Sequence, residues 1–550
     1  MKKIGKLLIG TVIVMMCLVV SSCGSTEKAS TTGSPTAALG NGVDDLDLTF
    51  LKMENTEENK IYSPLSIKYA LAILREGAKG ETAKQIENVI GTFEPDRYES
   101  NDNMSFANAL FIKNSYGVNA SYIDTLKEKY DADVVGDSFE NPDKINNYIS
   151  EKTLGLINGF YNDVSQYDFI LTNTLAIDME WINKIQLGMY YYCPHETYSH
   201  YISELQTWSR EYNYFEGKLV PVLLFGASFN KYDIVKDLGE NHIKNIVKEA
   251  YAEYKKNGGW DEIDNMDQYL DSYINSIRGN YNTYDMNTDF SYYVDDSVKV
   301  VAKDLKEYGG RTLEYVAIMP EKESLKTYIE KLDSKEANRL ISSLVSPSID
   351  NVEDGVVTKF EGELPPFKYD YKLNLMDDLK ALGIEDVFEK EKADLSQISD
   401  GAYIASAGHK AAIEFSNDGI KAAAITDLGG LGADGGFDYW FDVPVKVIDL
   451  KFIKPFVYLI RDKESGTVFF TGTVYNPSNE SVSAMGKVKV KVKKLNIRTS
   501  PSTSADTVGQ LVEGDVVEYY MNEFNDGYVW YNIGENKWVA TDGTYLEYVY

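Results

Sequence analysis

Cysteine and histidine are scarce in this chain of 550 residues. The sequence has three cysteines and four histidines, namely Cys17, Cys23, Cys193, His195, His200, His242 and His409. It holds no GxSxG, HExxH, paired CxxC or phosphate-binding P-loop motif. Cys193 and His195 stand close together, but in an aromatic stretch, where a lone cysteine is more often a packing residue. We therefore expect no enzyme, no metal site and no cofactor.

Basic residues are also few, with 55 Lys and Arg against 85 Asp and Glu and a net charge of −30. A protein that binds nucleic acid needs a basic face to neutralise phosphates, so we expect no nucleic-acid partner. Apolar residues make up 43% of the chain and charged residues 25%, which is typical of a folded, globular protein. The composition fits a soluble, secreted protein.

The start of the chain has the pattern of a targeting segment. Three lysines precede a short apolar run over residues 7–20, which ends at Val20-Ser21-Ser22-Cys23-Gly24. Small residues before such a cysteine form the site that a lipoprotein signal peptidase cuts, and the run is short for the alternative, a transmembrane helix. We predict a signal peptide over residues 1–23, lipidation of Cys23, and a flexible tether over residues 24–44. The protein would then lie at the extracellular face of the membrane, held only by its lipid, or be secreted.

From about Asp45 the chain mixes two hydrophobic periods. Helix-like periods alternate with β-rich runs, and the strands gather late in the sequence, which predicts an α+β domain around large antiparallel sheets. The predicted helices are 67–89, 120–130, 236–255 and 325–345, and the predicted β-rich runs are 313–319 and 456–475.

Separate segments resemble the motifs of one protein family. They are Ser63-Pro64-Leu65-Ser66-Ile67 with Gly77-Ala78-Lys79-Gly80, then Phe106-Ala107-Asn108-Ala109-Leu110-Phe111, then Thr172 through Trp181, and last Lys454-Pro455-Phe456 with Gly472 through Pro477. In this order the segments are similar to those of the serpins, a family of protease inhibitors. The resemblance covers residues 45–478 and implies helices, three antiparallel-rich sheets and an exposed reactive loop. Residues of about 190–295 exceed the family pattern and are expected to hold an insertion.

The resemblance also implies roles for single residues in the main sheet. Ser63, Ser66, Asn173 and His409 fall on the polar cluster beneath the centre of that sheet, called the shutter. Trp181 falls at the breach, where the reactive loop begins to enter the sheet. Short polar groups can exchange hydrogen-bond partners when a sheet opens. A lone histidine such as His409 is equally compatible with an ordinary core.

The segment from Ser416 to Thr426 resembles the hinge of the reactive loop. In an inserted strand, every second residue from Ile420 to Gly432 would face the core, and none of this set is charged, whereas an alanine-rich helix is the alternative. Asn417, Ile420 and Lys421 depart from the family pattern, which has Glu, Thr and Glu. The hinge residues implied by the resemblance are Gly419, Ile420, Lys421, Ala422, Ala423, Ala424, Ile425 and Thr426.

The serpin resemblance implies inhibition by a loop that a protease cuts and acylates before the loop enters the main sheet. Counting from Gly419 predicts the reactive bond at Ala433–Asp434, whereas counting back from Lys454 predicts it near Pro444, because the loop is about ten residues longer than usual. Ala433 suits an elastase-like or subtilisin-like serine protease, and a cysteine protease is a second class of target. A non-inhibitory scaffold or surface binding protein is the alternative.

After a polar linker over residues 479–486 the sequence changes character. Leu495-Asn496-Ile497-Arg498-Thr499-Ser500-Pro501, with later Trp530-Tyr531, resembles a bacterial SH3-type domain and predicts a small all-β barrel over residues 487–550. The resemblance implies binding of cell-wall polymer or peptide. The five lysines of residues 487–494 either face an anionic polymer or form a solvated strand edge that resists aggregation.

Overall fold

The computed structural model describes residues 42–187, 212–278, 281–286, 289–373, 375–420, 437, 439, 441, 443–477, 486–534 and 537–549. Several predicted features lie outside them, namely the signal peptide with Cys23, most of the tether and linker, the hinge residues Lys421, Ala422, Ala423, Ala424, Ile425 and Thr426, and the reactive bond Ala433–Asp434. In the described part of the chain, no helix is long and apolar enough to cross a membrane.

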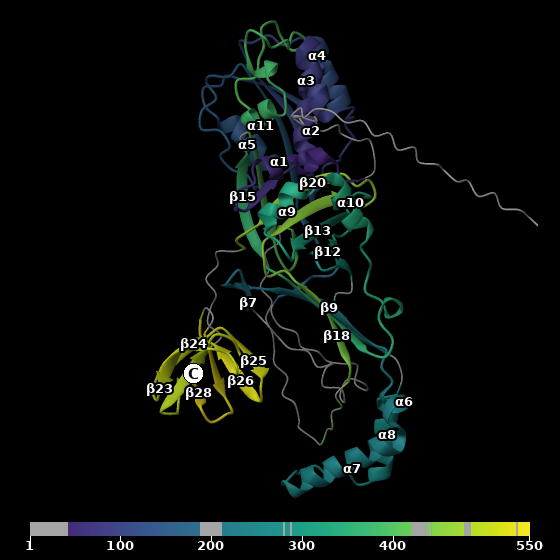
Figure 1. Ribbon diagram of the computed structural model, residues 1–550. Helices are drawn as coiled ribbons and strands as arrows, with labels where there is room; N and C mark the ends of the chain where they lie inside the picture. Colours follow the sequence, from purple (N-terminus) through teal and green to yellow (C-terminus); the bar gives the residue numbers. More distant parts are fainter. Residues whose placement is uncertain are drawn as a thin grey trace, which may run out of the picture. The chain divides into compact units, whose positions relative to one another are not determined.

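Helices dominate the first part of the chain (Figure 1). The helix α2 begins at Pro64, and the Ser63 side chain caps it by accepting the Ser66 N–H at 3.1 Å. The predicted helix 120–130 is α4. The five helices are α1 Asp45–Met53, α2 Pro64–Gly77, α3 Gly80–Ile90, α4 Ala120–Tyr130 and α5 Asp143–Lys152.

Each of three segments that were predicted to form one long helix forms two shorter helices instead. The period over 67–89 is interrupted after Gly77, where Ala78 is extended and Gly80 has φ +57°. Gly239, with φ +82°, ends one helix of the 236–255 segment, and Asp333 caps a new helix within 325–345. A hydrophobic period continues across such breaks because both helices pack on the same core. The resulting helices are α6 Ile234–Leu238, α7 Glu240–Lys256, α9 Leu325–Lys331 and α10 Ser334–Ser342.

A six-stranded antiparallel sheet has the order β1-β20-β19-β13-β12-β11. Its central strands β13, β19 and β20 are buried along their whole length, and they occupy the two predicted β-rich runs. The strands are β1 Lys60–Tyr62, β11 Phe290–Val294, β12 Val298–Asp304, β13 Leu313–Pro320, β19 Phe456–Asp462 and β20 Val468–Val474.

The main sheet consists of two groups of strands, β3-β2-β4 and β15-β16-β17-β5. The strands β4 and β5 follow each other with only Asp178 between them, so one continuous segment belongs to both groups. The strands are β2 Met104–Lys113, β3 Asp133–Asp137, β4 Phe169–Ile177, β5 Met179–Glu180, β15 Phe367–Leu373, β16 His409–Phe415 and β17 Gly419–Ile420.

A third sheet has the order β10-β9-β14-β18, with β6 beside β9 and with β14 parallel to β18. Between the main sheet and the six-stranded sheet lies an aromatic core. Phe415 contacts Tyr315 at 4.7 Å and stacks on Phe367 at 4.9 Å between ring centres. The strands of the third sheet are β6 Gln186–Leu187, β9 Leu223–Asn230, β10 Tyr281–Met286, β14 Val357–Leu364 and β18 Val445–Lys451.

The predicted insertion contains strands of the sheets as well as added elements. The strands β9, β10 and β11 of that stretch belong to the sheets described above, whereas α6, α7 and α8 form a separate small core together with residues of β14 and of the segment before β18. The remaining elements are α8 Met266–Ser276, the hairpin β7 Tyr212–Phe215 and β8 Lys218–Pro221, the helix α11 Leu375–Ala381, and the 3-10 turns η3 Ile349–Asn351 and η4 Asp386–Phe388.

The C-terminal region is all β, with the sheets β24-β21-β28 and β23-β22-β27-β26-β25. Its core contains Val488, Val490, Leu495 and Val539. The strands are β21 Gly486–Val490, β22 Lys494–Arg498, β23 Thr507–Val512, β24 Val516–Tyr519, β25 Met521–Asn525, β26 Tyr528–Asn532, β27 Trp538–Thr541 and β28 Leu546–Val549.

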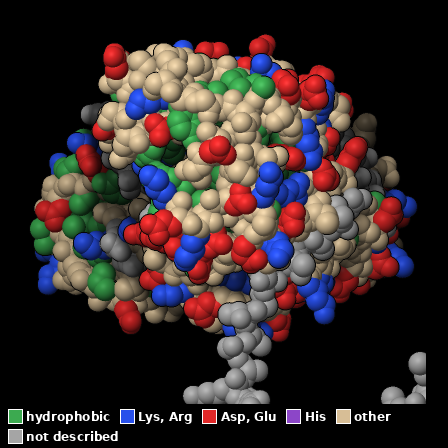
Figure 2. All heavy atoms as spheres, turned by 90° about the horizontal axis from the view of Figure 1, so that it is seen from above, with side chains coloured by type: hydrophobic (Ala, Val, Ile, Leu, Met, Phe, Trp, Pro, Cys, Tyr) green, Lys and Arg blue, Asp and Glu red, His purple; other side chains and the backbone are tan. Residues whose placement is uncertain are grey.

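Acidic and basic side chains are interspersed on the face of the molecule shown in Figure 2. Many of the lysines of the body have a carboxylate partner, such as Lys299 with Asp449 at 2.8 Å and Lys454 with Glu321 at 3.0 Å. No group of His, Cys, Asp and Glu suited to a metal ion is present among the described residues.

Candidate functional site: the hinge and the gap in the main sheet

The start of the predicted hinge already lies inside the main sheet. Gly419 pairs with Glu180 of β5, and Ile420 pairs with Met179 on one side and with Phe415 on the other. Ile420 is only 2% exposed. The first two residues of the hinge therefore occupy a strand position between β16 and β5 in the intact chain, although the resemblance implied an exposed loop.

Gly419 is the residue that this position requires. A Cβ atom there would lie 2.2 Å from the Met179 carbonyl oxygen and 2.6 Å from the Glu180 Cα, both of which belong to the backbone. Real Cβ atoms do not approach backbone this closely, so any other residue would push the two strands apart. The absence of a side chain lets the hinge enter between the strands.

Trp181 holds the hinge at this end of the sheet. Its side chain is fully buried, and its indole N–H donates to the Ser416 carbonyl oxygen at 2.9 Å. The Trp181 backbone N–H donates to the Asp418 carbonyl oxygen at 3.0 Å, and the Asp418 carboxylate pairs with Lys184. The structure thus places the predicted breach tryptophan directly against the hinge.

Below Ile420 the main sheet has a gap between β4 and β16. Both strands are described along their whole length, and they form no ladder with each other; β4 pairs with β2, and β16 pairs with β15. We call this space the sheet gap. Its outer face is covered near β4 by α5, which packs through Ile145 and Ile149 on Ile170.

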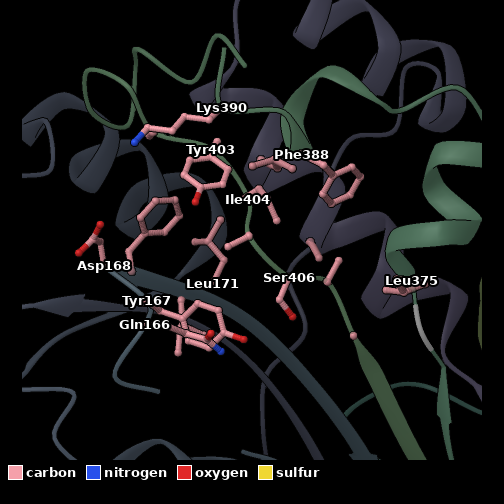
Figure 3. Close-up of a pocket in the computed structure, with 18 of the residues that line it drawn as sticks. Gln166, Tyr167, Asp168, Leu171, Leu375, Phe388, Lys390, Tyr403, Ile404 and Ser406 are labelled. Atoms are coloured by element: carbon pink, nitrogen blue, oxygen red, sulfur yellow. The ribbon is translucent and has the colours of Figure 1, made fainter. Parts of the chain in front are cut away.

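Three cavities lie along the sheet gap, and we call them upper, middle and lower in order of increasing distance from the hinge. The upper one, of about 10 Å³, is lined by Ile177, Ile413 and Ile420. The middle one, of about 90 Å³, contains the polar cluster, and the lower one, of about 270 Å³, lies at the far end of β4. Figure 3 shows Tyr403, Leu171 and Gln166 among the residues that line the lower cavity.

All four predicted shutter residues line the middle cavity. The Ser63 N–H donates to His409 Nε2 at 2.9 Å, so the imidazole is a hydrogen-bond acceptor at this atom. Ser66 belongs to the same turn through its bond to the Ser63 hydroxyl. Burial lowers the pKa of His409 to about 4, because the cavity offers the imidazolium no counter-charge.

Asn173 has an unused acceptor that faces this cluster. Its side-chain N–H donates to Asn108 Oδ1 at 2.7 Å, whereas its own Oδ1 is buried without a hydrogen-bond partner among the described residues. Asn108 was not among the predicted site residues. It is 4% exposed and donates to the Tyr130 carbonyl oxygen, and its place as a polar residue inside the apolar Phe106–Phe111 segment is a signal that could have identified it.

The alternative position of the reactive bond, Pro444, is held by backbone pairing. The Pro444 carbonyl oxygen accepts a hydrogen bond from the Val357 N–H at 2.8 Å, and the next residue begins β18. Val443 before it is 8% exposed. This part of the chain is a sheet edge rather than a free loop.

The model of the serpin (serine protease inhibitor) family matches residues 48–188 and 280–477. The chain belongs to the serpin family. Mouse neuroserpin is 25% identical over 455 residues, which cover 79% of this chain and 90% of the relative. A serine protease inhibitor of Cyanea capillata is 24% identical over 453 residues, covering 78% of this chain and 95% of the relative.

Solved serpin structures share this fold. The thermophilic serpin tengpin in its native state matches with a TM-score of 0.51 at 20% identity, covering 80% of this chain and 96% of the other. The predicted α+β serpin fold is therefore confirmed. Residues 189–279, with α6, α7 and α8, and the C-terminal all-β region lie outside the matched segments of the family model.

Proposed function

We propose that this serpin inhibits serine proteases by cleavage of its reactive loop, trapping of the acyl-enzyme and insertion of the loop into the sheet gap. Serpins are generally serine protease inhibitors. The observation that carries the proposal is the pairing of Gly419 and Ile420 between β16 and β5, at the end of a sheet gap that contains three cavities. A strand that has begun to form at one end of such a gap can lengthen by adding residues to an existing ladder.

The existing register predicts where each following residue would lie in an inserted strand. Continuing the pairs of Gly419 and Ile420 one residue at a time would place Thr426 between Asn173 and His409. The Thr426 hydroxyl could then donate to the unpaired Asn173 Oδ1. An inserted strand would in this way satisfy a buried acceptor, which costs about 1–3 kcal/mol when it is left unpaired.

The same register would place Leu428 beside Leu171 and Ala407, which both line the lower cavity. A leucine side chain in a cavity of this size gains apolar burial of about 1.5–3 kcal/mol. The core-facing set is uncharged as far as Gly432. The shape and polarity of the sheet gap therefore match the loop that would fill it.

Lys421 also fits this register, although the family pattern has Glu there. It would lie opposite Glu414 of β16, a carboxylate that is 19% exposed and at present pairs with Lys368 at 2.7 Å. Opposite charges on adjacent strands stabilise a pair by a few tenths of a kcal/mol to about 1 kcal/mol. A lysine in place of the family's glutamate at position 421 is thus compatible with insertion of the loop.

The lower end of the sheet gap supports Ala433–Asp434 as the reactive bond. In the continued register Ala433 would lie opposite Gln166, which lines the lower cavity three residues before β4 begins at Phe169. Insertion up to Ala433 would thus fill the sheet gap along the whole length of β4. The paired backbone at Pro444 presents no free loop to a protease active site.

The test is incubation of the intact protein with elastase-like and subtilisin-like serine proteases and with a papain-like cysteine protease. We expect a complex stable in SDS with at least one serine protease, and an upstream fragment ending at Ala433 by mass spectrometry. Cleavage without any complex would contradict inhibition and favour the non-inhibitory scaffold. A fragment ending elsewhere would contradict the position of the bond alone.

Attachment to the outer face of the membrane through a lipid on Cys23 is part of the same proposal, because an inhibitor held there would protect surface proteins. Labelling of the protein with a radioactive fatty acid tests the attachment, and the Cys23→Ser variant should not take up the label.

The lysines of the C-terminal region have acidic partners. Lys487 pairs with Glu518 at 3.3 Å and Lys491 pairs with Glu547 at 3.4 Å. These ion pairs favour a solvated surface over one that binds anionic wall polymer. Lys487 and Lys489 do not lie on a strand edge as expected, because β21 pairs with β24 on one side and with β28 on the other.

A further inference from the structure

An alternating aromatic stripe follows the predicted reactive bond. Phe437, Tyr439 and Phe441 stand at every second position, and we call them the aromatic stripe. Phe437 is 7% and Phe441 6% exposed, although both belong to the connection between hinge and β18. All three residues of the stripe belong to one apolar cluster, so they share a packing surface.

The aromatic stripe packs on α7 and α8, which we call the helical hairpin. The Phe437 ring lies 5.0 Å from Tyr251 of α7, and Phe441 lies 6.2 Å from Tyr273 of α8. Buried aliphatic residues of both helices complete this core, namely Ile243, Val247, Leu270 and Ile274. Aromatic contacts of this kind stabilise by about 0.5–1.5 kcal/mol each beyond their burial.

Backbone hydrogen bonds fix the same segment. The Phe437 N–H donates to Asp261 Oδ2 at 2.8 Å, and the Tyr273 hydroxyl donates to the Tyr439 carbonyl oxygen at 2.8 Å. The donors and acceptors come from the turn between the two helices and from α8. The downstream limb of the loop is therefore held by side chains and by its backbone.

The docked stripe limits how far an uncut loop can move. Full insertion would carry Ala433 about 43 Å from Ile420, at about 3.3 Å per residue, to the Gln166 end of β4. Only Asp434, Gly435 and Gly436 separate Ala433 from Phe437, a span of at most about 14 Å.

The stripe is docked at the opposite end of the main sheet from Gln166. It leads into β18 of the third sheet, which also contains β6, and β6 follows Trp181 at the hinge end. None of the residues that contact Phe437, which are Tyr251, Tyr254, Asp261 and Tyr269, lines any of the three cavities. An intact loop with its stripe docked therefore cannot reach the lower cavity.

We propose that the helical hairpin is a holding site for the downstream limb of the reactive loop, and that it makes insertion depend on cleavage upstream of Phe437. The proposal rests on loop insertion as the proposed function. Phe437, Tyr439 and Phe441 are then positioning residues. They would leave a loop of ordinary length for the bond at Ala433–Asp434, and they would oppose inactivation by insertion of the uncut loop. A cut at that bond frees the upstream limb while the downstream limb stays docked.

The experiment compares the full chain with Phe437→Ala/Phe441→Ala, with Tyr273→Phe and with Trp260→Ala. Each uncut protein is held about 10 °C below its first thermal transition. The rate of conversion to a heat-stable form that no longer makes protease complexes is measured, with intact mass checked throughout. We expect the double variant to convert at least ten times faster than the wild type, and Tyr273→Phe, which loses one hydrogen bond, about five times faster.

Trp260 is the matched control, because it is an aromatic residue between the same helices but is 68% exposed. We expect Trp260→Ala to convert at the wild-type rate. If the double variant does not fold, Tyr273→Phe still tests the holding site. Equal rates in all variants would overturn the inference, provided that the cut wild type gains thermal stability. A cut wild type without that gain would instead contradict the proposed function.

Discussion

At the residue scale, Gly419 decides whether the hinge can stay between β16 and β5. A methyl group there would meet the Met179 carbonyl oxygen at 2.2 Å. We expect Gly419→Ala to expel the hinge, to slow loop insertion after cleavage, and to shift the outcome at least tenfold from complex to free cut inhibitor. Gly117→Ala is the control, because no atom lies within 4 Å of its Cβ position. The ratio of complex to cut inhibitor on gels measures the effect, and an unchanged ratio in Gly419→Ala would refute it.

His409 makes the stability of the body depend on pH. Its pKa is about 4 in the folded protein against 6.5 as the ordinary value, so the unfolded chain binds more protons between these two values. The free energy of unfolding should therefore fall by up to about 3 kcal/mol as the pH drops from 6.5 to 4. Above pH 6.5, His409 should contribute no pH dependence. Urea unfolding at pH 7 and pH 5 measures it. His409→Asn, which keeps an acceptor for the Ser63 N–H, should lose this part of the dependence; an equal slope in both proteins would argue against it.

At the element scale, the inserting strand must keep its uncharged face towards the sheet gap. In the inserted state that we propose, the continued register would place Leu428 at the lower cavity and Asp427 on the other face, opposite Thr172 and Gly408. Leu428→Arg would bury an unpaired charge at a cost of several kcal/mol, so we expect the protease to cut this variant and escape. Asp427→Arg, a neighbouring change to the same residue type, should still form complexes. The yield of protease complex measures the effect. Equal yields from the two variants would contradict the predicted alternation of core-facing and outward-facing residues in the inserted strand.

The same elements show how far the sequence was informative. Ordered motifs identified the strands around Trp181 and the cluster of Ser63 and His409, because these segments must keep particular side chains to build the sheet. The breaks at Gly77 and Gly239 were missed, since a hydrophobic period continues through a helix junction when both helices share a core. The aromatic stripe was treated as extra loop length, because its partner is a helical hairpin outside the family pattern, and sequence spacing gives no sign of that contact.

At the scale of the whole molecule, insertion should make the cut protein more stable than the intact one. A strand of about a dozen residues adds ladder bonds of about 0.5–1.5 kcal/mol each, or about 10 kcal/mol in all. For a body of this size such a gain raises the melting temperature by about 10 °C, since the unfolding entropy is about 2.1 cal/mol/K per residue. Calorimetry of the protein before and after a cut at Ala433–Asp434 measures the gain. A cut in the linker 479–486, which leaves the loop intact, is the control and should leave the transition of the body unchanged. A loop cut that changed the transition no more than the linker cut would show that the uncut chain is not a kinetically trapped state.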